Sequence, residues 1–233
     1  TKEHTYVSGG TITGQEGFLG DGWIIICAPG VYQEQAPISV RARNLSIVGA
    51  SIRSTFIHPT TATQYETLFL ADSGFYLTQF TIAGIKAAGT RGNSKVDPDP
   101  TTGLPETQGW VVGFRPGCII RKSPYIQNCT NFSDESIDND DFDPNNLQGE
   151  AGDVGSGPTG GGILCDGAVP AIESPLRSFV VDAFTQIALG GPGILCTNNG
   201  YAQLVSFFGT FCWYHAKARN GGQLNLSNCT TDF

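Results

Sequence analysis

Short apolar runs alternate with turn residues along the first part of the chain. The run from Trp23 to Cys27 is fully apolar and ends in the turn Ala28-Pro29-Gly30. Further short runs rich in Val, Ile, Phe and Leu follow at residues 31–32, 38–40, 45–49, 55–57 and 68–70. Runs of this kind, cut by Gly, Pro and Asn, are typical of short β-strands. No interval leaves room for a crossover helix, so the pattern disfavours a doubly wound α/β fold.

A repeated pattern appears when distant segments are compared. Three segments share a Gly followed by a short alternating run, namely residues 73–80, 199–207 and 220–227, and the glycines of the last two are 21 residues apart. A second echo links residues 127–132 to 227–230, since both contain Asn-Cys-Thr. Such repeats indicate a solenoid, because one coil cannot bury its own inward face and needs stacked neighbours. Stacking should place Asn128 and Asn228 in polar ladders at turns.

These patterns predict an all-β fold, a right-handed parallel β-helix, as a single domain over residues 1–233. Two stretches, at about 87–108 and 134–162, break the rhythm and are predicted to be long loop insertions. In a solenoid such insertions leave the stack on one side and often meet a partner. The repeating pattern is still running at Phe233, so a fragment of a longer chain is kept as an alternative.

Charge and composition limit the partners. The net charge is −8, and the sequence contains no local cluster of Lys and Arg. Nucleic acids and anionic membranes attract basic patches, and no stretch has the length of a membrane-spanning helix. We therefore expect no nucleic-acid partner and no membrane insertion. Only 15% of the residues are charged, which suits the uncharged polar surface of an extracellular or particle-bound β protein.

Seven cysteines are scattered along the chain, without a CxxC pair. An odd number at irregular spacing argues against a disulfide framework and against a structural zinc site. Most of them follow apolar residues, as Cys27 and Cys196 do, which indicates buried free thiols that behave as small hydrophobes. Free thiols fit a protein made in a reducing cytoplasm.

The opening of the chain has a distinctive order of strands and turns. Residues 22–34 contain an apolar strand followed by Pro-Gly-Val-Tyr-Gln-Glu, and residues 45–49 and 53–57 continue with a strand, a Gly and a second strand. This opening resembles the first coils of pectin-lyase-like β-helices. The resemblance covers about the first quarter of the chain. It implies a fold, the right-handed parallel β-helix, more than an activity.

Four further blocks are spread over most of the chain, at residues 54–60, 117–130, 177–186 and 199–208. The string Asn-Gly-Tyr-Ala-Gln-Leu-Val-Ser in the last block is the most distinctive. These blocks resemble large virion structural proteins of contractile-tailed marine cyanophages. This resemblance implies a tail, baseplate or tail-fibre component that is made in the host cytoplasm and works in the virion. Its partners would be other virion proteins, with homo-oligomers expected and a host surface glycan as a further candidate.

Polysaccharide cleavage is the activity that a β-helix suggests, but the sequence does not carry its motifs. Polygalacturonase-like enzymes have adjacent Asp pairs and Gly-His-Gly on consecutive coils, and neither occurs here in a strand context. A lyase-like set could be drawn from Asp166, Asp182, Arg177 and Arg121, whose spacing is arbitrary. We therefore predict a structural protein and no enzyme. A carbohydrate-active tailspike or lyase and a non-catalytic glycan adhesin remain as alternatives, since fold does not imply function.

Contact candidates come from the second insertion and from a late aromatic patch. The insertion contains an acidic run with Asp138, Asp140, Asp141 and Asp143. The run fails the EF-hand template, so we predict a solvated contact loop and no cofactor, with a Ca²⁺ site as the minor alternative. In the aromatic patch at residues 211–214, we expect Trp213 or Tyr214 to be exposed as an interface residue.

Overall fold

The computed structural model describes residues 11–12, 22–87, 108–132, 160–187, 191–212 and 214–232. In this part of the chain the structure is almost all β, and its one helix is the short 3₁₀ helix η1 (Thr61–Thr63). Parallel strands lie in curled sheets, which confirms the predicted all-β class. No helix in the described residues is long and apolar enough to cross a membrane.

The described strands form two sheets. The seven-stranded sheet has the spatial order β1 (Thr11–Ile12), β4 (Ile38–Val40), β7 (Phe69–Ala71), β10 (Trp110–Phe114), β12 (Gly161–Asp166), β14 (Pro192–Thr197), β17 (Tyr214–Ala218). The main path of the twelve-stranded sheet has the order β18 (Gln223–Ser227), β15 (Tyr201–Val205), β13 (Ser178–Ile187), β11 (Tyr125–Phe132), β8 (Tyr76–Thr78), β5 (Ser46–Gly49), β2 (Ile24–Cys27). The same sheet also contains β3 (Gly30–Glu34), β6 (Thr55–Pro59), β9 (Thr81–Ala83), β16 (Phe208–Thr210) and β19 (Thr230–Thr231).

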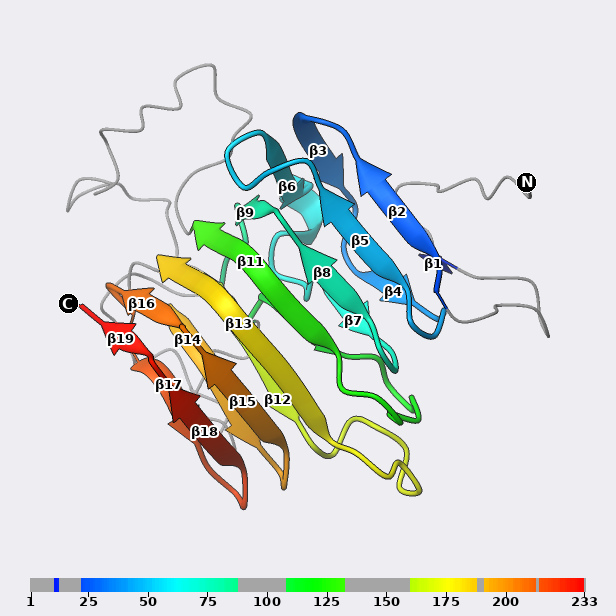
Figure 1. Ribbon diagram of the computed structural model, residues 1–233, viewed down its shortest axis with the longest axis vertical. Helices are drawn as coiled ribbons and strands as arrows, with labels where there is room; N and C mark the ends of the chain where they lie inside the picture. The colour runs from blue at the N-terminus through cyan, green and yellow to red at the C-terminus, as the bar shows by residue number, and fades with distance from the viewer. Residues whose placement is uncertain are drawn as a thin grey trace.

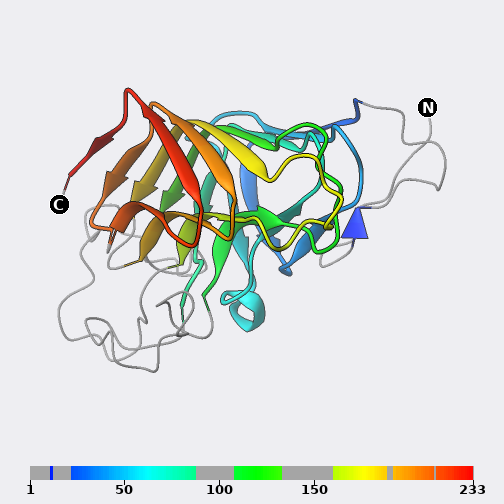
Figure 2. The same ribbon diagram turned by 90° about the horizontal axis from the view of Figure 1, so that it is seen from below.

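The chain passes repeatedly from the seven-stranded sheet into the twelve-stranded sheet, and we call each pass a coil. Strands β4, β5 and β6 of one coil pair in parallel with β7, β8 and β9 of the next. Figures 1 and 2 show the coils side by side, with the two sheets on opposite sides of the interior. Strand β11 is long because it pairs with both β8 and β9.

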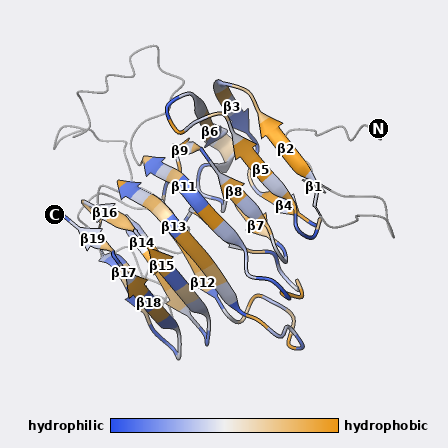
Figure 3. Cartoon of the chain, in the orientation of Figure 1, coloured by the Kyte–Doolittle hydropathy of each residue, from blue (hydrophilic) through white to orange (hydrophobic). Residues whose placement is uncertain are grey.

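In-register pairing places apolar side chains in columns that run from coil to coil. One column in the twelve-stranded sheet contains Ile47, Leu77, Ile126, Val181 and Leu204. All five side chains are buried and belong to one core cluster. Successive residues of a strand point to opposite faces, so the alternating pattern of the sequence directs these positions inward. Figure 3 shows hydrophilic positions in the turns and also on the strands, for example at the arrowheads of β11 and β13.

A second column consists of residues with left-handed backbone at the bend of the twelve-stranded sheet. It contains Gln79, Asn128, Ala183, Ser206 and Asn228, with φ between 48° and 67°. The prediction that Asn128 and Asn228 share a column is confirmed. A continuous amide ladder is not formed, because Ala183 lies between them and has no polar side chain. The amide of Asn228 instead donates a hydrogen bond to the hydroxyl of Ser206 at 3.3 Å.

Both predicted insertions lie largely outside the described residues. The first is bounded by Ala87 and Gln108, which form an isolated antiparallel bridge. The predicted end of the second, at residue 162, is wrong, because Gly161 and Gly162 begin strand β12. These glycines have a packing role, since a Cβ on Gly161 would lie 2.3 Å from the ring of Trp110.

All seven cysteines are free thiols. Burial is confirmed for Cys118, Cys129, Cys165 and Cys196, whereas Cys27, Cys212 and Cys229 are half-buried. Burial raises the pKa of Cys129 to about 12, so this thiol stays protonated near neutral pH.

Replacing Ala183 by Gly should stabilise the protein by about 0.5–1 kcal/mol. An L-residue in the left-handed region costs about 1–2 kcal/mol, and Gly removes this cost. Gly also loses more backbone entropy on folding than Ala does, which offsets part of the stabilisation. The matched control is Ala202→Gly, at a buried position of β15, which should destabilise by about 1 kcal/mol. Urea denaturation of both variants measures the difference, and a loss of stability in Ala183→Gly would contradict the left-handed assignment.

Candidate interaction surface

Only one of the predicted contact residues can be placed. Asp138, Asp140, Asp141, Asp143 and Trp213 lie outside the described residues. Tyr214 begins β17 and is half-buried, and it packs against a small apolar cluster formed by Trp110 and Leu195. Burial raises the pKa of Tyr214, and the ammonium of Lys217 lies 5.2 Å from the centre of its ring. Tyr214 therefore packs against the apolar cluster and is not fully exposed as an interface residue.

A group of basic residues that the sequence does not show as a cluster meets at one corner of the coils. Arg41 and Arg43 lie in the turn from β4 to β5, and Arg115, Arg121 and Lys122 lie in the turn from β10 to β11. Both turns join the seven-stranded sheet to the twelve-stranded sheet, at the lower right of Figure 1. We call these five residues the basic corner.

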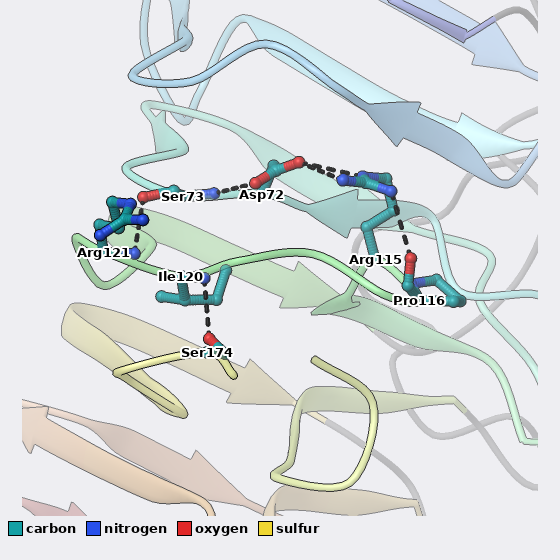
Figure 4. Close-up of polar contacts among 7 residues, drawn as sticks. All are labelled: Asp72, Ser73, Arg115, Pro116, Ile120, Arg121 and Ser174. Carbon is teal, nitrogen blue, oxygen red and sulfur yellow. Dashed lines mark hydrogen bonds and ion pairs between the residues drawn. The ribbon is translucent and has the colours of Figure 1, made fainter. Parts of the chain in front are cut away.

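Backbone contacts bring the two turns together through Ser73 in the intervening coil. The carbonyl of Ser73 accepts the N–H of Asn44 at 2.9 Å, and Gly74 donates to the carbonyl of Lys122 at 2.7 Å. The hydroxyl of Ser73 also accepts the N–H of Arg121 at 3.0 Å (Figure 4). It accepts the N–H of Lys122 at 3.0 Å as well. The turns are thus two coils apart, about 10 Å at the usual strand spacing.

One charge of the basic corner is neutralised by an acidic side chain. Nε and Nη2 of Arg115 donate to Oδ2 of Asp72 at 3.0 and 2.5 Å, while Oδ1 of Asp72 accepts the N–H of Ser73 at 2.6 Å. The Asp72 side chain is 8% exposed and that of Arg115 is 23% exposed. Arg115 also donates to the carbonyl of Pro116 at 3.2 Å (Figure 4). This pair fixes the turn, because the carboxylate joins two successive coils.

The other four cations of the basic corner are exposed. Arg41, Arg43, Arg121 and Lys122 have no ion pair with any acidic residue of the described chain. The described residues contain ten Lys or Arg against seven Asp or Glu, although the whole chain carries −8. The acidic excess therefore lies elsewhere, and residues 133–159 contain eight Asp or Glu and no Lys or Arg. The sequence contains no local cluster of Lys and Arg, and these residues come together only where the two turns stack. The expected absence of nucleic-acid and membrane partners stays a prediction.

Two apolar residues lie beside the basic corner. Ile172 is 92% exposed and Leu176 is 38% exposed, both in the turn from β12 to β13. The N–H of Leu176 donates to the carbonyl of Ile120 at 3.1 Å, which places it next to Arg121. Ser174 anchors the same turn, because its hydroxyl accepts the N–H of Ile120 at 2.9 Å (Figure 4). The corner therefore offers cations and exposed apolar surface together.

A polar network with two tyrosines lies on the outer face of β8, β11 and β13. The rings of Tyr76 and Tyr125 are 5.5 Å apart, and the hydroxyl of Tyr76 donates to Gln127 at 2.6 Å. Tyr125 and Gln127 both donate to Oδ2 of Asp182 at 2.9 Å. Burial, and then the hydrogen bond to Asp182, raise the pKa of Tyr125 to about 12. The network ties three coils together on their outer face.

The residues considered for a lyase-like site do not form one in the described chain. Asp182 belongs to the tyrosine network, and Asp166 accepts a hydrogen bond from Asn198 at 2.9 Å. Arg177 donates to the backbone carbonyls of Gly167 and Ile172. No carboxylate–arginine contact joins this set within the described residues. In the same part of the chain, no three His, Cys, Asp or Glu residues are grouped so that they could hold a metal ion.

No protein-family model, no curated protein and no solved structure matches this chain. The resemblance to pectin-lyase-like and virion proteins therefore stays an expectation from the sequence.

A double-mutant cycle on Asp72 and Arg115 should give a coupling of about 1–2 kcal/mol, because the pair is shielded from solvent and charge-assisted. The cycle uses Asp72→Ala, Arg115→Ala and the double variant in urea denaturation. Asp72→Ala combined with Arg219→Ala serves as control, since Arg219 lies in the turn after β17, and these effects should add. Additive effects for Asp72 and Arg115 would show that the ion pair does not stabilise the corner.

The raised pKa of Tyr125 predicts a loss of stability at high pH. The phenol ionises near pH 10 in the unfolded chain but near 12 in the folded one. The folded state therefore keeps more protons between these values, and the free energy of unfolding should fall as pH rises from about 10 to 12. Asp182→Asn should make this fall less steep without removing it, because burial remains. Unfolding free energies at several pH values in the wild type and in Tyr125→Phe test the assignment, and equal slopes would refute it.

Proposed function

We propose that the chain is a right-handed parallel β-helix of the pectin-lyase-like kind and serves as a rigid structural component of a phage particle. It would be a component of the tail, the baseplate or the tail fibre. The observation that carries the proposal is the unbroken core. A single cluster of buried side chains runs from Ala36 to Phe207, through successive coils that pair in register.

Rigidity follows from this architecture. Each coil forms hydrogen bonds with the coil before and the coil after it, so bending the stack would break several ladders at once. Aromatic pairs lock successive coils in the core, since the ring centroids of Phe114 and Phe179 are 4.3 Å apart and those of Phe184 and Phe207 are 6.4 Å apart. A body of this kind transmits force and holds fixed positions for neighbouring proteins, which is what a particle component must do.

Contacts with other particle proteins would use the turns and insertions, because the strands themselves are committed to the stack. The basic corner and the acidic sequence at residues 138–143 would supply charge for such contacts. Homo-oligomers and other virion proteins are the partners that the proposal names. It requires no cofactor and no catalytic step.

The test is incorporation into particles. In a phage that encodes this chain with an epitope tag, the protein should co-sediment with purified particles at a fixed ratio and appear in their tail or baseplate by cryo-electron microscopy. Val181→Asp, which puts a charge in the core, should prevent incorporation. Tyr201→Ala, at a partly exposed position of β15, should not.

A chain that stays in the supernatant while complete particles form would contradict the proposal. Particles that assemble normally without the chain but no longer adsorb to host cells would instead favour the glycan adhesin.

A further inference from the structure

Opposite charges are separated between two parts of this chain. The described coils carry a net positive charge, and residues 133–159 carry eight acidic residues without a cation. Opposite charges on two parts of a chain attract each other, here in a protein where only 15% of residues are charged. The basic corner has four exposed cations that pair with no acidic residue of the described chain.

We propose that the basic corner binds the acidic segment, residues 134–147, of a second copy of this chain. This inference rests on the proposed function, because it names the contact through which copies in a particle would join. The occupant is an acidic peptide that also contains apolar side chains. Ile137 precedes Asp138, Phe142 lies between Asp141 and Asp143, and Leu147 follows them.

The composition of the docking surface matches that peptide better than it matches a polyanionic sugar. Arg41, Arg43, Arg121 and Lys122 supply the charge. Exposed apolar surface comes from Leu176, whose N–H donates to the carbonyl of Ile120 next to Arg121, and from Ile172 in the same turn. An acidic polysaccharide would use the cations alone and leave Ile172 in water. A segment with Ile and Phe between aspartates would use both, and the burial of apolar surface would add to the attraction of the charges.

The topology favours a second copy over the chain's own segment. The segment follows Phe132, at the end of β11, whereas the basic corner precedes Tyr125, at the start of β11. The length of β11 between these two residues is about 23 Å. A fully extended chain from Phe132 spans at most about 22 Å to Asp138 and about 40 Å to Asp143. Binding in cis would therefore require the chain to reverse after Phe132 and return along the whole length of β11 before its aspartates reach the corner, whereas a neighbouring copy imposes no such reversal.

The experiment measures self-association of the purified full-length chain by sedimentation velocity, at salt concentrations from about 0.01 to 1 M. The wild type should associate at low salt and dissociate at high salt, because screening shortens the Debye length from about 30 to 3 Å. A corner variant with Arg41→Glu, Arg43→Glu and Arg121→Glu should weaken association at least tenfold. A segment variant with Asp138→Lys, Asp140→Lys and Asp141→Lys should do the same.

Mixing the two variants is the decisive arm. Each variant should be monomeric alone, but an equimolar mixture should associate, because each charge-reversed surface then meets a partner of opposite sign. Arg53→Glu, an exposed cation in the turn between β5 and β6, is the matched control and should associate like the wild type. Circular dichroism and thermal denaturation check that every variant is folded.

Three results would overturn the proposal. They are a wild type that is monomeric at every salt concentration, association that survives reversal of the corner, and two variants that stay monomeric when mixed. Retention on immobilised polygalacturonate that is lost in the corner variant, with no self-association, would make the corner a glycan site instead. If the chain is monomeric but is still incorporated into particles, this inference is wrong and the proposed function stands. If the chain self-associates but is absent from particles, only the proposed function is wrong.

Discussion

Parallel pairing in register between successive coils is the constraint on which the rest of this structure depends. A single coil contributes only a few inward side chains, such as Leu77 or Ile126, and cannot remove them from water by itself. Stacking places each inward residue against its equivalents in the coils on either side, so that one column becomes part of a continuous core. A shift of one residue in any pair would turn its apolar side chains outward. The stability of the core therefore depends directly on the strand register.

Register also determines what happens at the corners. At the bend of the twelve-stranded sheet it superposes residues with left-handed backbone, from Gln79 to Asn228. At the corner between the sheets it superposes the turns that carry Arg43, Ser73 and Lys122. The hydrogen bonds of Ser73 fix the spacing of this second stack, and the pair of Asp72 and Arg115 joins its coils. The charged surface of the protein is thus a consequence of how its core aligns.

Local patterns predicted the strands well. The runs at 38–40, 45–49 and 55–57 correspond to β4, β5 and β6, because alternation and punctuation by turn residues are properties of a few neighbouring residues. The repeated Asn-Cys-Thr placed Asn128 and Asn228 in one column for the same reason. The glycines that open β12 were misread as loop, since their need for a missing side chain arises from Trp110, far away in the sequence.

The basic corner could not be predicted from local patterns. Arg43 and Arg121 are far apart in the chain, and their turns stack only through the intervening coil that carries Ser73. Nothing in either neighbourhood indicates how many residues that return takes. Exposed Ile172 and Leu176 were missed likewise, because apolar residues in a sequence of this type are expected in strands. Surface composition of a stacked protein becomes visible only once register is known.

Methyl–methyl nuclear Overhauser effects in an isotope-labelled sample test the register most directly. The structure predicts strong effects along one column, from Leu77 to Ile126, from Ile126 to Val181 and from Val181 to Leu204, which are paired neighbours in successive coils. Absence of these three contacts, or their replacement by contacts shifted by one or two residues, would contradict the stack and with it the basic corner.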